Sequence, residues 1–315
     1  MTQRRRQRNI YLASGSGLAV IAAIAVVLGV VLSSGGGPGS GSSVDAGTFA
    51  LTGALTQADV AKVEDVPVGD LIANATAAAE VNTKLAAQPL QKMTGKPPAL
   101  SVGGKPEILY IGGEYCPYCA NERWAMVMAL SKFGTFSGLS GTTSSSTDVY
   151  PGTPTFSFYK SSYTSKYISF VGVEWYKNSG ENTSTGVWPT LQAPTSQQLS
   201  IINTYDAPPY VSTSAAGGIP FVYMDGKFVL IGPQYVDTQL SSMQWDSAAQ
   251  LLTAGNNSAS KNAEAAAGFL VGEICAISNG RPASVCSQVP KDLIGISTSS
   301  PKIKVVSKTP SAKKS

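Results

Sequence analysis

The chain of 315 residues contains no histidine. Without an imidazole it cannot form a serine–histidine or cysteine–histidine hydrolase site, and most catalysis by first-row metals is also excluded. Cysteine is scarce as well, with four residues in the whole chain. Sulfur is nevertheless the only obvious reactive chemistry that remains, so the positions of the cysteines carry the functional argument.

Two of the cysteines form the motif Cys116-Pro117-Tyr118-Cys119, between a predicted strand at 107–112 and a predicted helix at about 117–133. A cysteine at a helix N-terminus points its sulfur at unpaired backbone N–H groups. These groups stabilise the thiolate and are expected to lower the pKa of Cys116 below the ~8.5 of a free thiol. Cys119 follows within disulfide reach. A strand, a turn and C-x-x-C opening a helix is the thioredoxin-type redox arrangement, and half of a zinc site is the alternative.

The other two cysteines, Cys275 and Cys286, have ten residues between them. A zinc site built from all four cysteines is an awkward alternative, because zinc motifs usually space their cysteines two to four residues apart. We predict a structural disulfide that closes a loop at the C-terminal edge of the domain. A second redox pair that exchanges electrons with Cys116 and Cys119 is the alternative. No metal site and no cofactor are predicted.

The N-terminal segment predicts export. Residues 1–9 carry four arginines and no acid, and residues 10–32 contain no charged residue. Such a run spans about 30 Å of hydrocarbon, and the arginines keep the N-terminus in the cytoplasm. We therefore predict a single-pass signal anchor at 10–32 in the cell membrane, with the C-terminal domain outside the cytoplasm. A signal peptide that is cleaved to leave a secreted protein is the alternative, although no A-x-A site follows the run.

Composition divides the rest of the chain into four parts. We predict a flexible linker at 33–47, an N-terminal helical region at 48–97, a main domain at 98–296 and a disordered basic tail at 297–315. The net charge of +4 is weak evidence for a ligand, since basic residues crowd the two ends of the chain. This charge distribution indicates membrane topology and a solvated tail, so no nucleic-acid partner is predicted.

The order of elements in the main domain predicts an α/β fold with a central mixed sheet flanked by helices. After the first strand and helix, the pattern predicts a weak strand at 138–146, a half-buried hairpin of strands at 155–160 and 167–176, a helix at 195–205, a hairpin at 219–224 and 227–231 around Asp225-Gly226, and a helix at 237–253. The order β-α-β-α-β-β-α is that of the thioredoxin core, with a β-rich insertion around 147–190.

Several motifs resemble those of known redox proteins. Cys116-Pro117-Tyr118-Cys119 matches the active-site motif of glutaredoxins, and Gly218-Ile219-Pro220 is similar to the Gly-Ile-Pro of thioredoxins. The stretches 110–124 and 144–155 resemble a prokaryotic family of membrane-tethered, thioredoxin-like proteins of unassigned function. The resemblance covers roughly 98–290 and implies a thioredoxin-like fold.

The resemblance also implies roles for the matching residues. Cys116 would be the exposed attacking sulfur and Cys119 the buried resolving sulfur, with Pro117 and Tyr118 as neighbours. Pro220 would be a cis proline that lies against both sulfurs and keeps metals away, with Ile219 beside it.

One position departs from the thioredoxin pattern. Thioredoxins carry a buried acid six residues before the first cysteine, and Tyr110 stands at that position here. Glu107 begins the predicted strand and Glu114 is expected in an exposed turn, so the group that takes the proton of Cys119 is left open. Arg123, one turn after Cys119, either influences the charge of the thiolate or faces solvent.

These observations predict a membrane-tethered, extracytoplasmic thiol–disulfide oxidoreductase. Its substrates would be cysteine-containing exported proteins, and a separate membrane redox partner would be required if it works as a reductant. The direction of exchange cannot be read from the sequence. The alternative is a non-catalytic surface binding module on a thioredoxin scaffold, in which both disulfides are structural.

Overall fold

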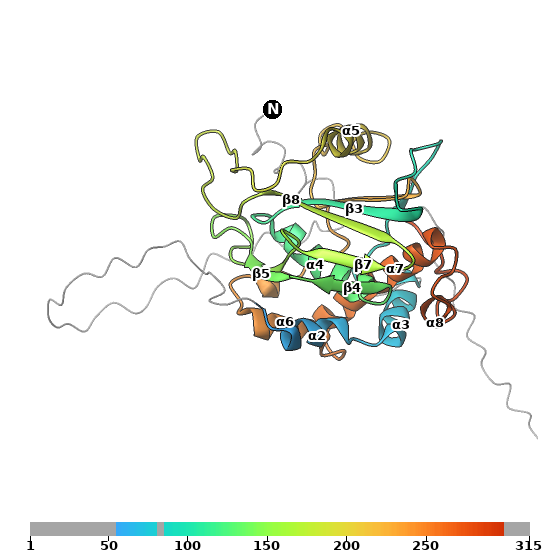
Figure 1. The fold of residues 1–315 in the computed structure, drawn as a ribbon. Helices are drawn as coiled ribbons and strands as arrows, with labels where there is room; N and C mark the ends of the chain where they lie inside the picture. The colour runs from blue at the N-terminus through green and yellow to red at the C-terminus, as the bar shows by residue number, and fades with distance from the viewer. Residues whose placement is uncertain (1–54, 81–84, 299–315) are drawn as a thin grey trace, which may run out of the picture.

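The computed structural model describes residues 55–80 and 85–298, which are coloured in Figure 1. The predicted cytoplasmic tail, signal anchor and linker, and the tail from 299 onward, lie outside the described residues. Among the helices of the described part, none is both long enough and apolar enough to span a membrane.

The described residues form helices and short strands in alternation. The helices are α2 (Gln57–Glu64), α3 (Val68–Ala79), α4 (Pro117–Leu130), α5 (Ser196–Tyr205), the 3-10 helix η1 (Thr238–Leu240), α6 (Trp245–Thr253), α7 (Ser258–Ile277) and α8 (Ala283–Cys286). The strands are β1 (Gln91–Lys92), β2 (Ser101–Val102), β3 (Lys105–Gly113), β4 (Gly134–Ser137), β5 (Ser140–Thr143), β6 (Pro154–Ser157), β7 (Ser162–Ser165), β8 (Ser169–Tyr176), β9 (Phe221–Met224) and β10 (Phe228–Ile231).

A mixed sheet forms the centre of the molecule. Its strands follow the order β1-β10-β9-β3-β2, and β8 also pairs with β3. The pair β3–β8 is parallel, whereas β3–β9 and β9–β10 are antiparallel. The hairpin predicted around Asp225-Gly226 is confirmed, and both turn residues have positive φ, as a tight hairpin turn requires. The predicted α/β class with a central mixed sheet flanked by helices is thus confirmed.

Helices cover both faces of this sheet (Figure 1). Helix α5 lies on one face, and α4 and α7 lie on the other, with α2, α3 and α6 further out. Side chains along β3 alternate between two cores: Ile108 and Tyr110 belong to the core on the α4 side, while Leu109 and Ile111 belong to the core beneath α5. Burial on both faces explains why the strand carries no charged residue from Ile108 to Gly113. The same alternation sends Tyr110 toward the helix that carries the cysteines.

The N-terminal helices share the core of the main domain. Helix α3 packs against α7, where a Cβ atom on Gly268 would lie 2.1 Å from the carbonyl oxygen of Leu71. Only glycine permits so close an approach of the two backbones. Strand β1 then adds to the edge of the central sheet by pairing with β10.

The hairpin predicted for 155–160 and 167–176 is wrong. Strand β6 pairs with β5, β7 pairs with β4, and β8 enters the central sheet parallel to β3. Alternating aromatic residues indicate a strand with a buried face but do not identify its partner. The helix predicted for 237–253 is also shorter than expected, because α6 begins at Trp245 and only the one-turn η1 precedes it.

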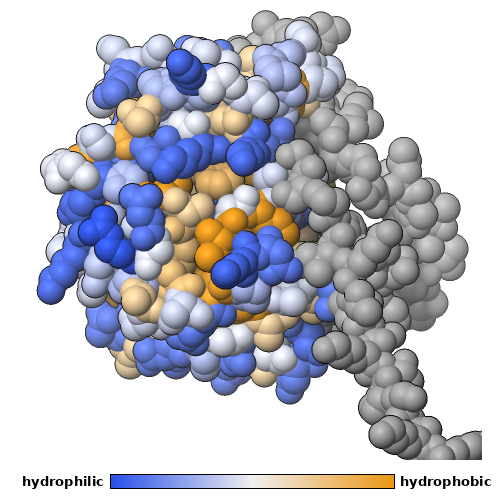
Figure 2. Space-filling view, turned by 90° about the vertical axis from the view of Figure 1, so that its right-hand side faces the viewer, coloured by the Kyte–Doolittle hydropathy of each residue, from blue (hydrophilic) through white to orange (hydrophobic). Residues whose placement is uncertain are grey.

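The surface on the right-hand side of Figure 1 is mostly polar around a central group of apolar residues (Figure 2). Across the described residues, the large apolar side chains that are exposed are Val102, Val149, Val187, Val236 and Ile294. Most large apolar side chains of the described part therefore lie inside, where they hold the layers together.

Candidate redox site

The cysteine motif lies where β3 passes into α4. Cys116 is the N-cap residue of α4, with an extended backbone (φ −83°, ψ 119°), and Pro117 is the first residue of the helix. Proline suits this position because the first backbone N–H of a helix has no partner within the helix. The N–H of Cys119 donates to the Cys116 sulfur over 3.4 Å. The helix thus begins with its free donors directed at sulfur, as the sequence predicts.

The predicted residues around the motif come together in space. The peptide bond between Ile219 and Pro220 is cis, and the Cys116 thiol lies 3.8 Å from the carbonyl oxygen of Ile219. The Cys116 thiol and the Ile219 carbonyl are close because β9 begins at Phe221 and runs antiparallel to β3. Pro117 and Pro220 are buried, while Tyr118 is half-buried.

Two aromatic side chains, Tyr115 and Trp188, pack in the same apolar cluster as both cysteines, and we call them the aromatic cover. Trp188 stacks on Tyr115 with ring centroids 4.5 Å apart and an angle of 3° between the ring planes. Both residues belong to one apolar cluster with Cys116, Cys119 and Ile219. On the other side of the motif, the Tyr118 ring lies edge-on to Tyr150 at 6.0 Å.

The enclosure leaves little sulfur accessible. Cys116 is 5% exposed and Cys119 is 0% exposed, and both are free thiols. The expectation of an exposed Cys116 is therefore wrong for this conformation. Trp188, from the segment between β5 and α5, belongs to the cluster in which the cysteines are buried, and the motif alone does not reveal it.

Burial also overturns the expected direction of the pKa shift at Cys116. Burial is the largest cause that raises the pKa of this thiol well above its ordinary value, followed by the hydrogen bond and charge of Cys119 and the charge of Asp148. The backbone N–H of Cys119 lowers the pKa. In this closed geometry, one helix N–H does not offset the loss of water around the sulfur.

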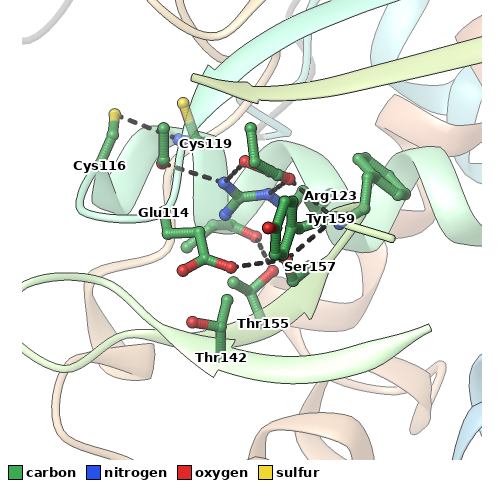
Figure 3. Close-up of polar contacts among 12 residues, drawn as sticks. Glu114, Cys116, Cys119, Arg123, Thr142, Thr155, Ser157 and Tyr159 are labelled. Atoms are coloured by element: carbon green, nitrogen blue, oxygen red, sulfur yellow. Dashed lines mark hydrogen bonds and ion pairs between the residues drawn. The ribbon is translucent and has the colours of Figure 1, made fainter. Parts of the chain in front are cut away.

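Arg123 of α4, which Figure 3 shows near the two cysteines, forms a buried ion pair with Glu174 of β8. Arg123 Nε donates to Glu174 Oε1 over 2.8 Å and Nη2 donates to Oε2 over 2.6 Å, while Nη2 also donates to the carbonyl oxygen of Gly113. Both side chains are 0% exposed, which excludes the solvent-facing role considered for Arg123. Glu174 points to this side of the sheet because it pairs with Gly112, two residues after Tyr110.

Tyr110 occupies the position of the thioredoxin acid and is fully buried. Its ring centroid lies 5.8 Å from Arg123 Cζ. Its hydroxyl lies so close to the backbone of Gly112 that a Cβ atom there would be 2.1 Å from the oxygen. Burial raises the pKa of Tyr110 well above 10.0; the charge of Arg123 opposes this, and the charge of Cys119 adds to it. The phenol is therefore neutral, and its buried hydroxyl has no hydrogen-bond partner among the described residues.

Glu114 is half-buried rather than in an exposed turn. Its Oε1 accepts a hydrogen bond from the Ser157 hydroxyl over 2.6 Å (Figure 3). Burial raises the pKa of Glu114, although the Ser157 hydrogen bond and the charge of Arg123 act in the opposite direction.

Cys275 and Cys286 form a disulfide with an S–S distance of 1.99 Å. The bond joins the end of α7 to α8, and these cysteines lie in the large core, not in the cluster around Cys116. In the described part of the chain, no group of three or more Cys, Asp or Glu side chains is arranged to hold a metal ion.

The sequence interpretation missed three residues of this site: Glu174, Trp188 and Tyr150. A signal existed for Glu174, since it is the only charged residue in the otherwise apolar and aromatic strand β8. Charged residues in buried strands usually have a specific partner. For Trp188 and Tyr150, nothing local in the sequence connects them to the cysteines.

Comparison with known proteins gives one family. The family model described as "Domain of unknown function (DUF929)" matches residues 92–275, which include Cys116, Cys119 and Pro220. No curated protein and no solved structure matches the chain significantly.

Proposed function

Because this chain belongs to the DUF929 family, whose description names no activity, we propose a function from the chemistry of the site: a thiol–disulfide oxidoreductase that exchanges disulfides with protein cysteines through Cys116 and Cys119. The observation that carries this proposal is the position of Cys116. It caps α4, accepts the N–H of Cys119 and lies 3.8 Å from the carbonyl oxygen that precedes a cis proline.

The arrangement of the central strands supports a thioredoxin-like fold. In the order β10-β9-β3-β8, the long strand that precedes the cysteines, β3, lies between a parallel neighbour and an antiparallel neighbour. The helix that carries the cysteines follows β3, so the motif lies at the carboxyl end of this strand. Sites in α/β proteins form at this end of the strands. Both features agree with the fold implied by the sequence resemblance.

The proposed reaction proceeds through a mixed disulfide. The Cys116 thiolate attacks one sulfur of a substrate disulfide, a Cys116–substrate bond forms, and the other substrate sulfur leaves as a thiolate that takes up a proton. Cys119 then attacks the Cys116 sulfur, the Cys116–Cys119 disulfide forms, and the remaining substrate thiol is released. The substrate gains two electrons and the protein loses two. The reverse sequence oxidises a substrate dithiol.

The proposed setting is outside the cytoplasm, with the segment 10–32 as a membrane anchor. This proposal rests on the basic N-terminus, the uncharged run and the even number of cysteines. Exported proteins with cysteines would then be the substrates. A membrane redox partner would be needed to supply electrons if the protein reduces its substrates.

The closed site also favours a second candidate, a binding module with no redox activity. Cys116 and Cys119 are 5% and 0% exposed, which suits cysteines whose role is structural. Under this alternative, the aromatic cover is a permanent part of the core.

A glutathione redox titration of the full-length protein separates the two candidates. After quenching with an alkylating reagent, mass spectrometry assigns the redox state of each cysteine, and the Cys275–Cys286 disulfide serves as an internal reference. We expect Cys116–Cys119 to reduce reversibly at a potential well above about −300 mV while Cys275–Cys286 stays oxidised. If both pairs resist the glutathione pool equally, the oxidoreductase is refuted and the binding module remains.

A further inference from the structure

The exchange proposed above requires negative charge on the buried sulfur. Whether the protein oxidises or reduces its substrate, Cys119 is a thiolate when it attacks or leaves the Cys116 sulfur. Cys119 is 0% exposed, so water cannot stabilise that charge. The protein must supply the stabilisation, and thioredoxins place an acid where this chain has Tyr110.

The groups around Cys119 are a phenol and a cation. The Tyr110 hydroxyl is buried and has no hydrogen-bond partner among the described residues, and the Tyr110 ring lies 5.8 Å from Cζ of Arg123, which follows Cys119 by one turn of α4. Burial lowers the pKa of Arg123, but the charge of Glu174 and smaller contributions from Tyr110 and Cys119 raise it well above its ordinary value. Arg123 is therefore charged. Arg123 thus places a positive charge one helical turn after Cys119.

The two carboxylates of this network, Glu174 and Glu114, accept hydrogen bonds from other groups. Both oxygens of Glu174 accept hydrogen bonds from Arg123, and Oε1 also accepts the N–H of Phe158. Glu114, the other acid that the charge of Arg123 affects, accepts the Ser157 hydroxyl. Arg123 Nη1 is buried and has no hydrogen-bond partner among the described residues. The network therefore contains two buried donors without partners, the Tyr110 hydroxyl and Arg123 Nη1, together with the positive charge of Arg123.

We propose that Tyr110 is a catalytic residue that donates a hydrogen bond to the Cys119 thiolate during exchange, and that Arg123, held by Glu174, is a positioning residue that adds positive charge beside them. This inference rests on the proposed function. It replaces base catalysis at the resolving cysteine with stabilisation of the thiolate by a neutral donor.

The protons and electrons balance without a protein base. In the second step, the Cys119 proton goes to the departing substrate thiolate, directly or through solvent once the cover has moved. The Cys116–Cys119 bond forms, the Cys116–substrate bond breaks, and the substrate leaves as a neutral thiol. Tyr110 keeps its own proton throughout and contributes only the hydrogen bond.

The test uses the full-length reduced protein and dithiobis(nitrobenzoate), a small aromatic disulfide. Attack by Cys116 releases one coloured thionitrobenzoate, and attack by Cys119 on the resulting mixed disulfide releases a second. The first step is bimolecular and the second unimolecular, so a high reagent concentration separates them. Mass spectrometry of acid-quenched samples locates the adduct.

We expect the Tyr110→Phe variant to form the Cys116 adduct at the wild-type rate and to resolve it at least about tenfold more slowly, because a hydrogen bond to a charged group is lost. Tyr163→Phe is the matched control. Tyr163 is another largely buried tyrosine of the core on the α4 side, but its hydroxyl donates to Leu130 O. This variant should resolve the adduct at the wild-type rate.

The Arg123→Lys variant keeps the positive charge but loses the paired hydrogen bonds that the guanidinium donates to Glu174, so it tests the two contributions separately. It should resolve the adduct faster than Arg123→Met, because only lysine keeps the positive charge. If wild-type protein forms no Cys116 adduct, the proposed function itself fails. If the adduct forms and Tyr110→Phe resolves it at the wild-type rate, or slows both steps equally, the inference is overturned while the proposed function stands.

Discussion

Replacing Trp188 by alanine should open the cysteine pair to reagents. Trp188 stacks on Tyr115 at 4.5 Å and belongs to the same apolar cluster as Cys116. Cys116 is 5% exposed, so a reagent or substrate reaches it only after this cover moves. The substitution removes contacts that exist in the closed form and not in the open form. It therefore lowers the free energy of opening directly.

The structure sets the size of the effect. Trp188 is 3% exposed, and truncation of a buried tryptophan to alanine typically costs about 3–5 kcal/mol. Neighbouring side chains relax around the smaller residue and recover part of this cost. We therefore assign about 2 kcal/mol of it to the free energy of opening. Since each ~1.4 kcal/mol is a factor of ten in an equilibrium, the open fraction rises on the order of 30-fold. The rate of Cys116 alkylation should rise equally, provided that the cover opens and closes faster than the reagent reacts.

The assay is iodoacetamide alkylation of the reduced full-length protein near neutral pH, with each cysteine assigned by mass spectrometry. Val187→Ala is the control, because Val187 is the exposed neighbour of Trp188 (51%) and is absent from that cluster. We expect Trp188→Ala to accelerate alkylation of Cys116 and Val187→Ala to change it by less than about twofold. An unchanged rate in Trp188→Ala would refute the idea that this cover limits access. Equal acceleration at Cys116 and Cys119 would instead indicate general unfolding.

Two further predictions concern stability. Burial raises the pKa of Glu122 to about 8 from 4.5, so the unfolded chain loses this proton first as pH rises, and stability should fall by about 3–4 kcal/mol between about pH 5 and pH 8 through this group. Urea unfolding of Glu122→Gln should show that the variant gains stability over wild type at the higher pH only, whereas an equal difference at both pH values would contradict this assignment. Replacing both Cys275 and Cys286 by alanine should lower the free energy of unfolding by about 3 kcal/mol through loop entropy and leave exchange at Cys116 intact. Loss of exchange in that variant, with the domain still folded, would support a second redox pair instead.

Local patterns predict the elements that carry the cysteines. The apolar run before Cys116 forms β3, the helix follows it, and the Asp225-Gly226 turn forms a hairpin. These features depend on residues close together in sequence, where periodicity and turn chemistry act. The cis peptide bond at Pro220 also agrees with what the Gly-Ile-Pro resemblance implies.

The environment of the cysteines could not be predicted in the same way. The partner of β8 is β3, more than fifty residues earlier in the chain, and parallel pairing has no local signature. Because that pairing was missed, Glu174 could not be connected to Arg123. The backbone donors at the start of α4 are local and predictable, but the cluster that buries Cys116 includes Trp188, which lies far along the chain. Long-range packing decided both outcomes.

Two features therefore bear on exchange at the cysteine pair. The first is the aromatic cover, since burial raises the pKa of Cys116 and slows its attack. The second is the group formed by Tyr110 and the Arg123–Glu174 ion pair, which under the further inference would stabilise negative charge on Cys119 once exchange begins. A buried ion pair is costly to desolvate and is weak evidence for stability alone, so its position near the cysteines (Figure 3) favours a chemical role. Under the proposed function, a substrate that displaces the cover exposes Cys116, while Tyr110 and Arg123 are already in place to stabilise a Cys119 thiolate. Exchange is then coupled to binding, which limits reaction of the pair with free small thiols.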